Sequence, residues 1–139
     1  METLLETATV VPAVNQIEFH PYLQRANGYV QWLQGRGITV QGFFGLLPIT
    51  WAKGGPLDGV LREMAGRKGV SESAVLARWG LNKGVVCITT ARSEGRFGLY
   101  FGCLGLVLSE EEMAVIDRVG GGHHVRMRFP EMFDAEDRS

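Results

Sequence analysis

The sequence has little cysteine, no strong net charge and no long apolar run. Cys87 and Cys103 are the two cysteines among 139 residues, and neither has the paired spacing typical of zinc or redox sites. We therefore expect buried free thiols in a reducing compartment, which favours a cytoplasmic location. Residues 1–9 carry Glu2 and Glu6 but no basic segment, so we expect no signal or transit peptide there.

The charge balance and hydropathy exclude two further classes of partner. The formal net charge is −1, with 14 Lys and Arg against 15 Asp and Glu, so no overall field attracts nucleic acid or an anionic membrane. No apolar stretch approaches the roughly 20 residues that span a bilayer. Hydrophobic residues make up 45% of the chain, which is ordinary for a globular domain with one core. We expect neither a nucleic-acid nor a membrane partner.

Apolar runs rich in β-branched residues alternate with segments of helical spacing. Strands are predicted at 10–19, 38–44 and 85–90. Helices are predicted at 1–8, 29–34, 57–69, 71–84 and 109–122. Strands that alternate with helices pair in parallel through right-handed crossovers. The sequence therefore predicts the α/β class.

Two helix starts carry clear capping signals, and one helical segment is weak. Ser71 can cap the helix that follows it, and Ser109 with Glu112 forms a capping box. Residues 92–105 have a helical register, but they include four glycines, each of which costs about 1 kcal/mol relative to alanine. We expect this helix to be poorly formed.

Several segments, in order along the chain, resemble one known family. Pro12–Leu23, which reads PAVNQIEFHPYL, resembles the sixth strand of aldo-keto reductases and the turn after it. Gly37–Phe43 is similar to their seventh strand, and Gly84–Thr90 to their eighth. The helix VSESAVLARW and the ending after His123 continue the match, the ending resembling a xylose-reductase-like branch common in fungi. The resemblance covers essentially the whole chain.

Aldo-keto reductases are (β/α)8 TIM barrels, so the resemblance implies a partial barrel. It would hold the last three parallel strands with their helices over residues 1–122, followed by a C-terminal tail at 123–139. Three strands leave two open edges, and we expect Val14, Phe19 and Val40 to lose part of their cover.

The family reaction implies that the chemistry lies outside this sequence. Aldo-keto reductases transfer hydride from NADPH to an aldehyde or ketone, while a tyrosine donates the proton. Lysine and aspartate lower the pKa of that tyrosine, and a histidine orients the carbonyl. These four residues lie on the first four strands or just after them, whereas this sequence aligns only from the helix before the sixth. We therefore expect no catalytic residue here and a missing tetrad.

The resemblance does assign cofactor-binding roles, with NADP(H) as the cofactor. Gln16 matches the glutamine that hydrogen-bonds the nicotinamide carboxamide; the alternative is a buried polar residue satisfied by neighbouring backbone. Phe43 stands where the family has a tyrosine that stacks on the nicotinamide; the alternative is an ordinary core aromatic. Phe44 and Gly45 replace residues that usually approach the pyrophosphate.

The phosphate-binding positions are partly retained. Arg96 aligns with the arginine that grips the adenosine 2′-phosphate, for which a guanidinium is well suited; a solvated loop arginine is the alternative. Thr90 and Ala91 occupy positions that are usually Lys-Ser, and Arg92 adds charge beside them. Because contacts are lost or changed, we expect NADPH binding by this chain alone to be slight.

The histidines predict no metal site. His20 belongs to the His-Pro turn, where a structural role is expected. His123 and His124 lie in the tail without other ligand types nearby in the sequence.

Three interpretations follow from the sequence. The first is a truncated NADP(H)-dependent aldo-keto reductase, an oxidoreductase acting on small-molecule carbonyl substrates but inactive alone. The second is a non-catalytic module that binds a full-length paralogue or a partner chain covering the open barrel edges. The third is a degenerate fragment. Most of the substrate pocket in the family comes from loops outside the matched region, so no particular carbonyl substrate is predicted.

Overall fold

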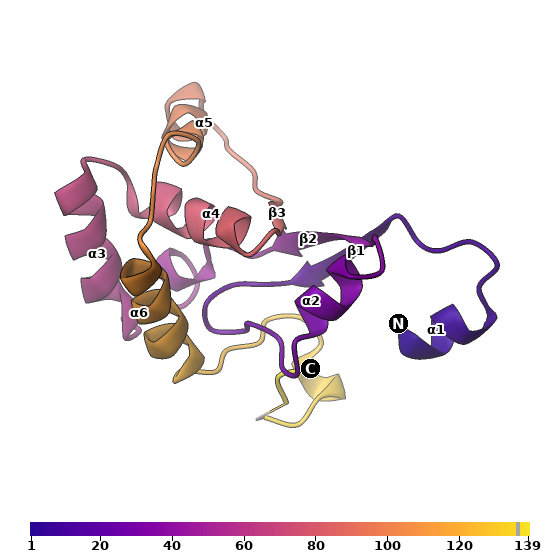
Figure 1. Ribbon diagram of the computed structural model, residues 1–139. Coiled ribbons are helices and arrows are strands. Elements are labelled where there is room, and N and C mark those ends of the chain that lie inside the picture. Colours follow the sequence, from indigo (N-terminus) through magenta and orange to yellow (C-terminus); the bar gives the residue numbers. More distant parts are fainter. Residues whose placement is uncertain (136) are drawn as a thin grey trace.

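Three parallel strands form a single sheet in the order β1–β2–β3 (Figure 1). The computed structural model describes residues 1–135 and 137–139. β1 (Val14–Glu18) pairs with β2 (Thr39–Phe43) along its whole length, and β2 pairs with β3 (Val86–Cys87) at two positions. The predicted α/β class and parallel pairing are confirmed.

The described part of the chain contains six α-helices. They are α1 (Glu2–Thr7), α2 (Tyr29–Gln34), α3 (Leu57–Lys68), α4 (Glu72–Asn82), α5 (Glu94–Phe101) and α6 (Glu110–Gly121), with short 3-10 helices at Leu47–Ile49 and Pro130–Met132. Figure 1 shows α1 standing apart from the rest and α5 projecting at the top.

Some element bounds differ from the predictions for identifiable reasons. The first strand begins at Val14 rather than at residue 10, because Pro12 has no amide to donate to a ladder. The third strand pairs with β2 over two residues instead of six. The glycine-rich segment is helical only at 94–101, and no residue of that helix is buried.

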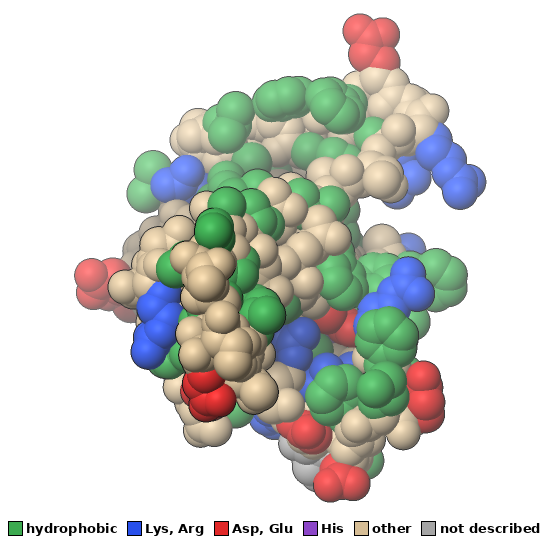
Figure 2. All heavy atoms as spheres, turned by 90° about the vertical axis from the view of Figure 1, so that its right-hand side faces the viewer, with side chains coloured by type: hydrophobic (Ala, Val, Ile, Leu, Met, Phe, Trp, Pro, Cys, Tyr) green, Lys and Arg blue, Asp and Glu red, His purple; other side chains and the backbone are tan. Residues whose placement is uncertain are grey.

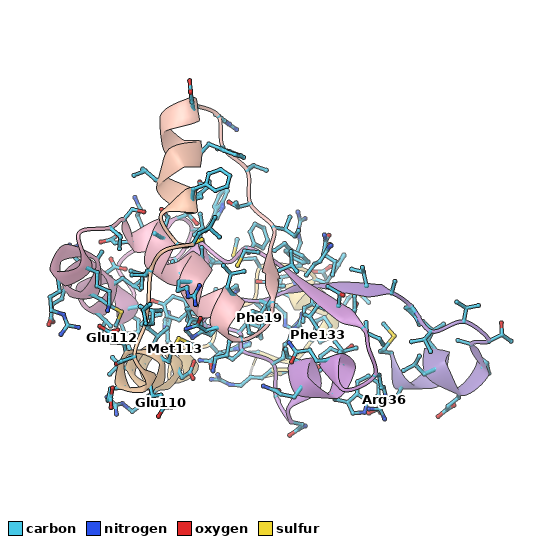
Figure 3. All side chains as sticks on the ribbon, turned by 45° about the horizontal axis from the view of Figure 1, so that its top comes forward. Phe19, Arg36, Glu110, Glu112, Met113 and Phe133 are labelled. Carbon is cyan, nitrogen blue, oxygen red and sulfur yellow. The ribbon has the colours of Figure 1, made fainter. Side chains whose placement is uncertain are left out.

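Helices pack against one face of the sheet and leave the other open. Phe19 and Val40 point toward the helices and are buried, and Phe19 stacks on Trp79 of α4 with ring centroids 5.1 Å apart. In Figure 3 Phe19 lies near the centre of the molecule. On the opposite face Val14 is 44% exposed and Val86 is 43% exposed. The expected loss of cover is therefore correct for Val14 but wrong for Phe19 and Val40, which face the helices.

Polar contacts join α6 to the helical layer. The side chain of Asp117 accepts hydrogen bonds from Trp79 Nε1 at 2.8 Å and from Lys83 Nζ at 2.5 Å. Glu112, labelled at the start of α6 in Figure 3, pairs with Lys68 of α3 at 2.9 Å. The capping box is formed: Ser109 Oγ accepts from the Glu112 amide, and the Glu112 carboxylate accepts from the Ser109 amide. α6 is thus fixed both at its start and along its length.

Substitution of the α6 cap tests this arrangement. We expect Ser109→Ala to lower the free energy of unfolding by about 1 kcal/mol, because it leaves an N-terminal amide of α6 without its acceptor. Urea denaturation followed by circular dichroism measures the change. Ser93→Ala is the matched control: Ser93 Oγ caps the exposed α5 across a longer 3.4 Å contact, so its loss should cost less. Equal effects of the two substitutions would contradict this ranking.

Candidate functional site

A pocket of about 480 Å³ lies where the sheet meets α5, at the carboxyl ends of β2 and β3. Its walls come from the loop after β2, the start of the link after β3, and α5. In Figure 2 the upper part of the molecule, which carries α5, is separated from the body by a hollow. Loops that follow parallel strands meet at one edge of the sheet, which is where α/β proteins generally bind ligands.

Four of the five predicted cofactor residues line this pocket. Phe43 ends β2, Thr90 and Arg92 follow β3, and Arg96 lies on α5. Gln16 does not line it. It lies on the open face of β1, where its Nε2 donates to Gln41 Oε1 at 3.1 Å. The alternative of a buried residue satisfied by backbone is therefore wrong for Gln16, because its side chain is exposed and its partner is another side chain.

The pocket has a cationic rim on the α5 side. Arg92 and Arg96 are both exposed, and among the described residues neither guanidinium forms an ion pair with a carboxylate. A guanidinium that no carboxylate neutralises can bind an external anion through paired hydrogen bonds. The arrangement thus suits a ligand with an apolar ring and a phosphate group.

Two aromatic residues of the pocket wall were not predicted from the sequence. Trp51, 74% exposed, lies in the loop after β2, and Tyr100 lies on α5 and donates its hydroxyl hydrogen to the Thr90 carbonyl at 3.3 Å. Phe44 also lines the pocket, with a φ of 60°, which is a left-handed conformation uncommon outside glycine. Large aromatic residues in the segments that follow the strands were the available signal, but their convergence on one pocket depends on the fold.

Cys87 lies at the pocket and carries a strongly perturbed thiol. Burial, and to a lesser degree the nearby Cys103, raises the pKa of Cys87 to about 11. Burial also raises the pKa of Cys103. Both cysteines are free, with Cys103 buried and Cys87 partly buried. Since the thiolate is the nucleophile, the raised pKa makes Cys87 a poor nucleophile at neutral pH.

A second polar cluster, outside the pocket, joins the C-terminal tail to β1. The Glu18 carboxylate, 1% exposed, accepts the amides of Met127 and Arg128, each at 2.8 Å. His20 Nε2 lies 3.0 Å from the same carboxylate, and its ring is fully buried. The structural role expected for His20 is confirmed. The contact between Glu18 and the tail was not predicted, because the only sequence signal was an acidic residue inside an apolar run.

Burial and hydrogen bonds act in opposite directions on this pair. Burial alone would raise the pKa of Glu18, but the hydrogen bonds from His20 and from the two tail amides outweigh it and leave that pKa below its ordinary value. Burial lowers the pKa of His20 by more than Glu18 raises it. The pair is therefore an ionised carboxylate beside a neutral imidazole at neutral pH.

The described residues hold no candidate metal cluster and no helix that could span a membrane. No group of three or more His, Cys, Asp and Glu side chains there is arranged to hold a metal ion. His123 instead packs edge-on against the Tyr22 ring, with centroids 4.7 Å apart. No helix in that part of the chain is both long and apolar enough to cross a bilayer.

The known proteins that resemble this chain include several reductases. No family model matches the chain. It is 32% identical over 127 residues to an NAD/NADP-dependent indole-3-acetaldehyde reductase of Schizosaccharomyces pombe, covering 91% of this chain and 45% of that protein. It is 35% identical over 124 residues to aldo-keto reductase family 1 member A1 of Xenopus tropicalis, covering 84% and 37%. The chain thus spans less than half the length of these relatives.

The fold matches solved structures over the same portion. An aldose reductase from Giardia lamblia superimposes with a TM-score of 0.78 at 25% identity, over 95% of this chain and 45% of that one. The predicted partial barrel is therefore confirmed: the three strands correspond to part of a (β/α)8 barrel, and their sheet is open.

The raised pKa of Cys87 predicts its reactivity. At pH 8 the thiolate fraction, and with it the rate of alkylation by iodoacetamide, should be roughly a hundredfold lower than for an unperturbed cysteine. The rate should rise toward about pH 11. The measurement uses the wild-type protein, with alkylation of Cys87 and Cys103 separated by peptide mass spectrometry, and the same protein in urea serves as the reference. A rate that levels off near pH 9 in the folded protein would contradict the account.

Proposed function

Because this chain is homologous to one part of the aldo-keto reductase barrel, we propose that it supplies the portion that holds NADP(H) in such an enzyme. The reaction of that enzyme is hydride transfer between the cofactor and a small-molecule aldehyde or ketone. The proton donor and its partners belong to the remaining barrel strands. The lone segment of 139 residues then reduces no carbonyl compound.

The convergence of four residues on one pocket carries this proposal. Phe43, Thr90, Arg92 and Arg96 are 53 positions apart at the extremes, yet all line the same cavity. Phe43 offers a ring face for stacking, and the two arginines offer charge for a phosphate. NADP(H) differs from NAD(H) by the adenosine 2′-phosphate, and Arg96 is the residue we assign to it. The Schizosaccharomyces pombe relative is named as NAD/NADP-dependent, which agrees with this cofactor class.

None of the tyrosines here is placed as the proton donor. Tyr22 is buried, its hydroxyl accepts the Leu57 amide at 3.2 Å, and burial raises its pKa above the ordinary value, so it holds its proton more tightly. Tyr29 accepts a hydrogen bond from Asn15 on the far side of β1 from the open face. Tyr100 lines the pocket but donates to the Thr90 carbonyl. An acid for the reaction has to come from elsewhere in the barrel.

The exposed apolar residues on the open face of the sheet support a function in which further barrel strands cover that face. Parallel sheets normally bury both faces, whereas here Val14, Val86 and Ile88 are 44%, 43% and 38% exposed. Beside the sheet edge, Phe97 and Phe101 of α5 are more than half exposed. Apolar groups in these positions suit cover by the remaining strands and helices of a barrel. In this proposal those strands are supplied by upstream sequence or by a separate partner chain.

A chimeric barrel tests the proposal. Residues 1–139 are joined behind the non-matching N-terminal portion of the Schizosaccharomyces pombe relative, and NADPH oxidation is followed with a simple aldehyde. We expect turnover by the chimera and none above buffer by the 139 residues alone. Turnover by the lone chain, or an inactive chimera that is folded, would contradict the proposal.

Arg96 is tested in the same chimera. We expect Arg96→Ala to raise the KM for NADPH about tenfold or more, because a charged hydrogen bond to phosphate contributes ~1.5–3 kcal/mol. The KM for NADH, which lacks the 2′-phosphate, should change little. Arg62→Ala, on the exposed side of α3, is the matched control and should leave both values unchanged. An equal effect of Arg96→Ala on the two cofactors would rule out the assigned role.

A further inference from the structure

The attachment of the C-terminal tail depends on one buried carboxylate. Each oxygen of Glu18 accepts a backbone amide, Oε1 from Met127 and Oε2 from Arg128, both at 2.8 Å. Charge-assisted hydrogen bonds of this kind are about twice as strong as neutral ones. The two amides belong to consecutive residues, so the carboxylate fixes both the position and the direction of the tail. We call Met127–Arg128 the strap.

The strap also reaches the pocket. The Arg128 guanidinium carbon lies 5.5 Å from the centre of the Phe44 ring, within the range of cation–π attraction. Phe44 lines the pocket and contacts the Phe43 ring edge-on, with centroids 5.5 Å apart. Phe44 has a φ of 60°, a conformation that costs free energy for a bulky residue and persists where surrounding contacts hold it. The Arg128 side chain is one such contact.

We propose that Glu18 and Arg128 are positioning residues that set the wall of the pocket through the strap. Glu18 holds the strap, the strap places the Arg128 side chain, and Arg128 holds Phe44 in its left-handed conformation next to Phe43. Neither residue touches the ligand in this scheme. The inference goes beyond the proposed function, and its test needs no nucleotide.

The charges around Glu18 fix the expected pH dependence. His20 hydrogen-bonds the Glu18 carboxylate, and Arg25 donates to the Glu18 backbone carbonyl at 3.0 Å. Arg126 of the tail lies near both His20 and Arg25. Asp137 faces Arg25 and Arg126 and partly balances them. The hydrogen bonds from His20 and from the Met127 and Arg128 amides outweigh burial and leave the pKa of Glu18 lowered from 4.5.

The direction of the pH effect follows from these shifts. A lowered carboxyl pKa contributes stability that is present above the ordinary value and is lost as the pH falls through the lowered one. The lowered pKa of His20 acts in the same direction, since the unfolded chain takes up that proton first as the pH falls below 6.5. The strap should therefore hold at neutral pH and release in acid, with the step that belongs to Glu18 below pH 4.5.

Amide hydrogen exchange of the 139-residue protein tests the hold on the strap. We expect Glu18→Gln to lower the protection factors of the Met127 and Arg128 amides about tenfold or more, because the amide side chain presents one acceptor instead of two. The exposed Glu131→Gln, on the same tail, should leave them unchanged. The Trp79 amide in α4 serves as a reference for global unfolding. Unchanged strap protection, or an equal loss at Trp79, would overturn the proposal.

A second pair of variants tests the link to the pocket wall. The Leu47 amide donates to the Phe44 carbonyl at 2.8 Å, so its protection reports on Phe44. Arg128→Ala should lower Leu47 protection severalfold while the strap amides stay protected, and Arg128→Lys, which keeps a cation over the ring, should restore most of it. In the wild type, protection of the strap amides should fall as the pH drops below 4.5 and Glu18 takes up a proton. This fall should be absent in Glu18→Gln. Unchanged Leu47 protection in Arg128→Ala, or the same acid profile in both proteins, would refute the positioning role.

Discussion

The in-register parallel pairing of β1 and β2 is the constraint on which the rest of the structure depends. Matching Val14 with Thr39 and Glu18 with Phe43 sends Ile17 and Val40 to the helical side of the sheet and Val14 to the open side. A parallel sheet is stable when both faces are covered, and here α2 and α4 pack directly against one face. The open face is thus a direct consequence of the register together with the helices present in the chain.

The same pairing assembles the pocket and the attachment of the tail. Because β1, β2 and β3 run in one direction, their carboxyl ends meet, and Glu18, Phe43 and Thr90 come to neighbouring places on one rim. The pocket forms on the β2–β3 side of that rim, and the tail is bound on the β1 side. Arg128, which lies over Phe44, connects the two.

Local signals made much of the fold predictable. The bounds of α2 and the capping box of α6 agree with the sequence, because propensity, spacing and capping act within a few residues. The alignment of Arg96 and Thr90 with family positions placed them in one site, and the pocket contains both.

The remainder depends on contacts between distant residues, which no local pattern carries. The Glu18 carboxylate and the strap amides are 109 and 110 residues apart. Trp51 reaches the pocket from the loop after β2 and Tyr100 from α5. The burial of Phe19 and Val40 depends on which face of the sheet the helices pack against. Gln16 aligns with a cofactor-binding residue of the family. It lies on the open face of the sheet, outside the pocket, and its side chain bonds Gln41.

Accessibility of the open face tests the central claim most directly. Gln16→Cys places a thiol on that face, and its rate of labelling with a maleimide can be followed by peptide mass spectrometry, which separates it from Cys87 and Cys103. We expect rapid labelling in the 139-residue chain, and labelling at least roughly tenfold slower once the complementary barrel strands are joined to it. Equal rates in the two proteins would show that this face is not the one the rest of a barrel covers.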